Sequence, residues 1–103
     1  MLFMLRIEVS LPAEMPDADK SSLRQRENAR AEELIAQGNM QRIWRIVGRV
    51  ANFSVWQAPT LEALHELVMS MPMFPYMKID VTPLIDHPVT HVAESRNGSA
   101  PER

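Results

Sequence analysis

The sequence predicts an α+β domain in which a four-stranded antiparallel sheet carries two helices on one of its faces. Two observations predict this class. Segments with alternating apolar residues, typical of strands, are interrupted by two segments in which apolar residues recur every three or four positions, typical of helices. The order along the 103 residues is β-α-β-β-α-β, and a chain of this length forms one domain.

The first strand is predicted over residues 2–11, where apolar residues occupy every second position until Pro12 ends the pattern. A helix is predicted from Asp17 to Gln37, because acidic residues stand in its first turn and Gly38 follows its end. Its inward stripe is expected to run through Leu23, Ala31, Leu34 and Ile35.

The middle and the end of the chain supply the remaining elements. Two β-rich runs within residues 41–57 predict a hairpin that turns near Gly48. A second helix is predicted over residues 60–71, with Thr60 as its N-cap, and a last strand over residues 76–84. This β-α-β-β-α-β order is that of the ferredoxin-like fold.

The predicted domain covers residues 1–88, because the periodicity is lost from about residue 87 onward. Residues 89–103 are polar and contain Gly, Pro and Ser, so we expect a tail that in part contacts other subunits and in part is disordered. The strands are apolar on both faces, whereas the helices cover only one. We therefore expect the bare face to be buried against a second copy, in dimers within a larger homo-oligomer.

Composition excludes several functional classes. A formal net charge of −2 argues against nucleic acid as a partner. The chain contains no cysteine, which excludes disulfides and thiol chemistry and fits a cytoplasmic protein. No stretch reaches the roughly 20 apolar residues of a membrane helix, and the apolar start contains Arg6 and Glu8, so we do not expect a secretory signal or a membrane span.

Glu27 is the first candidate for chemistry. It lies four residues after Leu23 and four before Ala31, on the inward stripe of the first helix. Burial would raise the pKa of its carboxyl group, as a general base working near neutral pH requires. The alternative from the pattern alone is a structural ion pair with Arg24 or Arg30 on the same helix.

Arg45 is the second candidate, because it interrupts an otherwise apolar strand. It would bind the carboxylate of a small acid or stabilise an enolate oxygen, unless it forms a structural ion pair with Glu8 or Asp80 on a neighbouring strand. His65 follows Leu64 on the second helix and is either a core residue or a proton donor. The three histidines lack the spacing of metal ligands, and we expect no metal and no cofactor.

Several segments resemble the muconolactone Δ-isomerase family. The strings MLFMLRIEVSLPAEMP, NMQRIWRIVGRVANFSVW and LEALHELVMSMPMFPYMKIDVTPLIDHP are similar to the family's motifs, and the match extends from Met1 to about Pro88. The resemblance implies a ferredoxin-like fold, a cofactor-free isomerase and a homodecamer built from dimers. It also implies conversion of muconolactone to 3-oxoadipate enol-lactone in the catechol branch of the β-ketoadipate pathway.

The resemblance also implies roles for individual residues. Glu27 would be the base that moves the proton, and Arg45, Asn52 or His65 would donate hydrogen bonds to the dienolate oxygen. Arg24 or Arg45 would hold the free carboxylate of the lactone. The remaining residues expected in the substrate pocket are Trp44, Ser54 and Tyr76.

The chain departs from the family pattern at several positions. It has Met40 where the family usually has Trp and Val50 where it usually has Tyr, and Met4 and Lys78 also differ. These changes leave open an isomerase or dehalogenase that acts on a chloro- or methyl-substituted muconolactone. A non-catalytic oligomer that binds a small acid is the remaining alternative.

Overall fold

A computed structural model describes residues 1–90 and 93, and its elements follow the predicted order. The strands are β1 (Leu2–Val9), β2 (Met40–Arg45), β3 (Ala51–Gln57) and β4 (Met77–Leu84). The helices are α1 (Asp17–Ala36) and α2 (Leu61–Met69), and a short 3-10 turn, η1 (Phe74–Tyr76), precedes β4. The sheet is antiparallel with the order β2-β3-β1-β4, so the predicted ferredoxin-like α+β class is confirmed.

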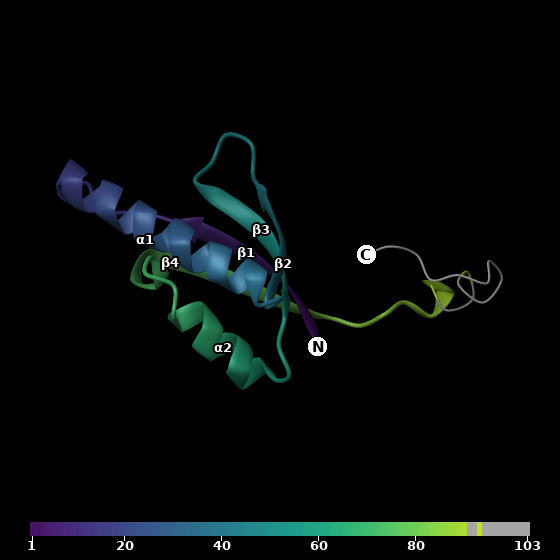
Figure 1. The fold of residues 1–103 in the computed structure, drawn as a ribbon. Coiled ribbons are helices and arrows are strands. Elements are labelled where there is room, and N and C mark those ends of the chain that lie inside the picture. Colours follow the sequence, from purple (N-terminus) through teal and green to yellow (C-terminus); the bar gives the residue numbers. More distant parts are fainter. Residues whose placement is uncertain (91–92, 94–103) are drawn as a thin grey trace.

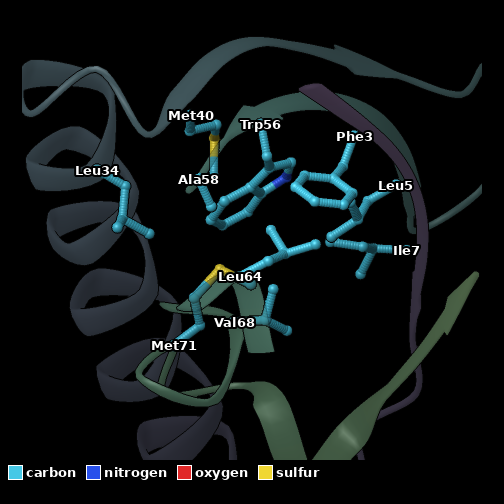
Figure 2. Close-up of a cluster of buried hydrophobic side chains, with 10 residues drawn as sticks. All are labelled: Phe3, Leu5, Ile7, Leu34, Met40, Trp56, Ala58, Leu64, Val68 and Met71. Atoms are coloured by element: carbon cyan, nitrogen blue, oxygen red, sulfur yellow. The ribbon is translucent and has the colours of Figure 1, made fainter. Parts of the chain in front are cut away.

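Both helices lie on the same face of the sheet (Figure 1). The core between them contains Leu34 from α1, Leu64 from α2, and Phe3 and Trp56 from the sheet, all at most 1% exposed. Figure 2 shows these side chains converging between the helices and β1. Burial of such large apolar side chains, each contributing roughly 1.5–3 kcal/mol, fixes how the helices sit on the sheet.

The element ends follow local rules. The side chain of Thr60 accepts a hydrogen bond from the backbone N–H of Ala63 at 3.0 Å, which caps α2 as predicted. Gly38 after α1 and Gly48 in the β2–β3 turn have φ of +83° and +81°, a region in which most other residues are strained. The last strand begins at Met77 rather than at residue 76, because Tyr76 belongs to η1.

A bulge in β2 decides which of its side chains face the helices. The pairing with β3 shifts between Met40 and Arg42, so one extra residue interrupts the alternation. Arg45 then pairs with Asn52, and Trp44 with Phe53. Arg45 consequently lies on the helix-covered face and Trp44 on the opposite one.

The opposite face of the sheet is bare, as expected, and its β2–β3 half exposes large apolar side chains. Trp44 is 43% and Phe53 40% exposed, and the guanidinium of Arg42 lies 5.1 Å from the centroid of the Trp44 ring. After β4 the chain leaves the sheet (Figure 1), and Ile85 in this segment is 91% exposed. Among the described residues, no helix has the length and apolarity to cross a membrane. The predicted tail beyond residue 90 lies outside the described residues, apart from Ala93.

Candidate active site

A pocket of about 580 Å³ lies between α1 and the β2–β3 half of the sheet. A volume of this size is typical of sites for small molecules. Its walls come from α1, from all four strands and from the segment after α2, and most of its lining is apolar. The polar members of the lining are Arg24, Glu27, Asn28, Arg45 and Asn52.

Among the residues that line this pocket, Glu27 is the acidic one, and its side chain is partly buried. The backbone N–H of Met73 donates a hydrogen bond of 2.8 Å to its Oε1 atom. Burial raises the pKa of the Glu27 carboxyl above its ordinary value, and the hydrogen bond from Met73 offsets part of that rise. A carboxylate held by one neutral donor keeps lone pairs available for a proton from a ligand.

The structure does not support the ion pair that was the alternative for Glu27. Arg30 binds Glu33 at 2.9 Å and the Oγ atom of Ser70 at 3.0 Å. Within residues 1–90, Glu27 forms no salt bridge, and Arg24 lines the pocket beside it without pairing. The carboxylate is therefore held in place by α1 and by the Met73 amide rather than by a cation.

Arg24 and Arg45 bring positive charge to the pocket from two sides. Arg24 lies on α1 three residues before Glu27, and Arg45 ends β2 opposite Asn52. The side chain of neither arginine forms an ion pair or a hydrogen bond with another described residue. Glu8, considered as a partner for Arg45, instead binds Arg6 and Arg49, both at 3.1 Å. Two exposed guanidinium groups are thus available to an anionic ligand.

Asn52 and Ser54 project from β3 toward the helices, because Asn52 pairs with Ile7 and Ser54 with Leu5 on the buried face of β1. Asn52 lines the pocket, and its buried Oδ1 atom has no hydrogen-bond partner in the described part of the chain. Ser54 is fully buried and accepts a hydrogen bond of 2.7 Å from Nε1 of Trp56. Ser54 is therefore behind the pocket wall rather than on it.

The apolar wall of the pocket is rich in methionine. Thioether side chains are flexible and polarisable, so such a wall adapts to differently shaped ligands. Val50 and Met40, two positions at which the sequence departs from the family pattern, both line the pocket. The four methionines are Met40, Met71, Met73 and Met77.

Three residues expected at the site lie elsewhere in this chain. Trp44 faces away from the pocket on the bare side of the sheet, since neighbours in a strand point to opposite faces. Tyr76 lies in η1 and is absent from the lining of the pocket. His65 is exposed on the far flank of α2, where its ring packs edge-on against Phe74 at 6.3 Å. The structure thus separates His65 from Glu27.

His65 belongs to a second, larger hollow of about 690 Å³ between α2 and β4. Its acidic residues Glu62 and Glu66 stand on the exposed surface of α2, and the rest of its lining is mostly apolar. We assign the chemistry to the smaller pocket, because it contains the perturbed carboxylate.

The hydrogen bond from the Met73 amide to Glu27 was not predicted from the sequence. A backbone N–H leaves no signal in residue type, so only the packing of the segment after α2 against α1 could reveal it. Within the described residues, no group of three or more His, Asp or Glu side chains is arranged to hold a metal ion.

Comparison with known proteins agrees with this geometry. Residues 1–90 match the protein family described as muconolactone delta-isomerase. The chain is 43% identical to a muconolactone delta-isomerase of Cupriavidus pinatubonensis over 88 residues. This aligned region covers 85% of this chain and 96% of that protein. The chain is 36% identical over 96 residues to one of Pseudomonas aeruginosa, which covers 93% and 100%.

Solved structures give the same result. A crystal structure of a muconolactone isomerase superposes with a TM-score of 0.81 and 42% identity, over 85% of this chain and 92% of that one. A 5-chloro-2-hydroxyhydroquinone dehydrochlorinase from Burkholderia phenoliruptrix, solved with 2,5-dihydroxybenzoquinone, superposes with a TM-score of 0.64. That chain is 16% identical, over 84% of this chain and 96% of its own, so it shares the fold alone.

Proposed function

Since this chain belongs to the muconolactone delta-isomerase family, we propose that it converts muconolactone to 3-oxoadipate enol-lactone in the catabolism of aromatic compounds. The observation that carries the proposal is the Glu27 carboxylate. It is partly buried, has a raised pKa and faces a pocket that also contains two arginines without an ion-pair partner among residues 1–90. Such a site suits proton transfer on a small anionic molecule.

Glu27 acts as a single base in this reaction. It removes a proton from the saturated ring carbon next to the C=C bond, which is itself conjugated with the lactone carbonyl. It returns the proton to the carbon beside the carbonyl, and the double bond moves by one position. The raised pKa brings the carboxylate closer to the working pH, which favours both the removal and the return of the proton.

The negative charge of the intermediate has to be stabilised by hydrogen-bond donors. Removal of the proton places negative charge on the lactone oxygen, and Asn52 on the pocket wall donates to it. The free carboxylate of the lactone pairs with Arg45 and Arg24, which lack protein partners in residues 1–90. His65 takes no part in this scheme, because it lines the other hollow.

The test uses the purified protein with muconolactone. We expect the absorbance of the conjugated lactone to change with time and the enol-lactone to accumulate as the product. A protein that assembles normally and leaves muconolactone unchanged overturns the assignment.

A second candidate substrate is a chloro- or methyl-substituted muconolactone. It is favoured by the positions of Met40 and Val50, which make the pocket wall softer and remove a hydroxyl group relative to the family pattern. With 5-chloromuconolactone the same proton abstraction would be followed by loss of chloride. Release of chloride at a higher kcat/KM than isomerisation of muconolactone would select this substrate.

The protein is further proposed to work as a cytoplasmic homo-oligomer of paired sheets, up to a decamer. The exposed Trp44 and Phe53 on the bare face, together with the exposed Ile85, support burial against other copies. Light scattering at micromolar concentration is expected to show an oligomer. A particle with the mass of one chain would contradict this part of the proposal.

A further inference from the structure

The pocket under α1 has two different ends. Its lining follows α1 through Arg24, Glu27 and Ala31, which lie about one helical turn apart and span roughly 10 Å. Residues 37–39 alone connect α1 to β2, and the two elements pack against each other, so β2 runs back along the helix. Met40 therefore lies toward the Ala31 end of the pocket, and Arg45 toward the Arg24 end.

The exposure of the lining falls from one end to the other. Arg24 and Arg45 are exposed, and Glu27 between the ends is partly buried. Met40 is only 2% exposed and Met71 only 3%, and both belong to the hydrophobic core that Figure 2 shows. The pocket thus has an open, basic end at the two arginines and a closed, thioether-lined end at the two methionines.

This gradient fixes the direction in which a lactone acid enters. A carboxylate needs water or an opposite charge, and it finds both beside Arg24 and Arg45 but neither at the closed end. In muconolactone the carboxylate is on the side chain of the ring carbon that loses the proton. With the side chain at the open end and that carbon at Glu27, the C=C bond of the ring points toward the closed end.

We infer that Met40 is a specificity-determining residue, and that the closed end of the pocket takes an apolar substituent on the C=C bond of the lactone ring. The substrate class is an unsaturated lactone acid with a methyl group on that bond. The unbranched thioether of Met40 makes room for the methyl group by changing its rotamer, whereas a larger, rigid side chain would fill the space.

The inference rests on the proposed isomerase function and separates two residues of the pocket wall. Val50 precedes β3 and is 65% exposed, so it belongs to the open end. Bulk added at Val50 should therefore not compete with a methyl group on the ring, whereas bulk added at Met40 should.

The specificity of the enzyme for two lactones tests this role. The kcat/KM for muconolactone with a methyl group on the ring C=C bond is divided by the kcat/KM for muconolactone, which cancels losses common to both. Met40→Trp is expected to lower this ratio at least about tenfold, the usual lower limit for one methyl group in a pocket that lacks room for it. Val50→Trp, the matched change at the open end, should alter the ratio less than about threefold.

Two outcomes of this experiment overturn the inference. One is a ratio that Met40→Trp leaves unchanged or that Val50→Trp lowers equally. The other is a wild type whose ratio is below about one hundredth, because the closed end then rejects the methyl group. Ala31→Leu, which adds bulk to the same end from α1, should lower the ratio at least about fivefold and replaces Met40→Trp if that variant does not assemble.

A binding experiment gives a second readout that needs no turnover. The saturated lactone acid lacks the C=C bond and cannot isomerise, and calorimetry compares it with its ring-methylated form. In the wild type the methyl group should tighten binding about threefold to fourfold, and in Met40→Trp it should weaken binding. If the wild type isomerises neither lactone but shows this difference, the proposed function fails and the role of Met40 stands. If the methyl group has the same effect in both proteins, the role of Met40 fails whatever the activity.

Discussion

Two hollows on the same side of the sheet differ in what they can do. The hollow between α2 and β4 is the larger, at about 690 Å³, but its charged side chains lie on an exposed helix surface. The pocket under α1, at about 580 Å³, holds the partly buried Glu27, whose Oε1 atom accepts from a backbone amide. Volume and apolar lining therefore do not locate the chemistry. The chemistry is located by a carboxylate that is desolvated but not neutralised by a cation.

The difference arises from packing. α1 packs against β2 on the helix-covered face, so its inward stripe carries Glu27 into the pocket that Arg45 and Asn52 also line. α2 buries Leu64 and Val68 and thereby turns His65 toward its outer flank. The same spacing rule thus places one titratable residue in a site and another outside it.

The largest expected effect separates the two hollows. Glu27→Gln should lower kcat by roughly 10²- to 10⁴-fold, because an amide cannot accept the proton. His65→Gln, the matched change in the other hollow, should alter kcat by less than about threefold. Both are measured by the absorbance of the lactone, after light scattering has shown normal assembly.

The opposite ranking would reverse the assignment. A Glu27→Gln enzyme that keeps more than about a tenth of the wild-type kcat excludes Glu27 as the general base. A severe loss in His65→Gln would place chemistry in the hollow beside α2.

A smaller effect distinguishes the two faces of β2. Arg45→Met should lower kcat/KM about 10- to 100-fold, because a charged hydrogen bond to the lactone carboxylate contributes about 1.5–3 kcal/mol. Arg42→Met removes the same charge three residues earlier on the bare face, where the guanidinium stacks on Trp44. We expect it to leave kcat/KM within about threefold, and equal losses in both variants would contradict binding by Arg45.

The smallest expected effect is on stability. Burial raises the pKa of Glu27 in the folded protein, so the folded state binds this proton more tightly than the unfolded chain. Stability is therefore lost as the pH rises through the raised pKa, and Glu27→Gln should have a higher Tm than the wild type at pH 7. The two Tm values should converge at a pH below 4.5, the ordinary pKa of a glutamate carboxyl. A lower Tm for the variant at pH 7 would show that the ionised carboxylate stabilises the fold.

The sequence was sufficient for the features that depend on periodicity. The β-α-β-β-α-β order and the inward position of Glu27 follow from spacings of 3.6 and 2.0 residues. The exposed apolar residues on the bare face followed from strands with apolar residues on both sides.

Other features depend on contacts that no local pattern records. The bulge before Arg42 determines that Arg45 faces the helices and Trp44 does not. The Met73 amide reaches Glu27 only because the segment after α2 folds back onto α1. The rotation of α2 about its axis, and hence the separation of His65 from Glu27, is set by how Leu64 and Val68 fill the core.

The titration of Glu27 itself decides whether this carboxylate is the base. Carbon-13 NMR of the Glu27 carboxyl in the substrate-free oligomer is compared with the pH dependence of kcat/KM, which reports groups of the free enzyme. We predict one shared midpoint, above the ordinary glutamate value of 4.5, with activity lost as the pH falls through it. A Glu27 that titrates at or below 4.5, or a kcat/KM profile with a different midpoint, would contradict the assignment of Glu27 as the base.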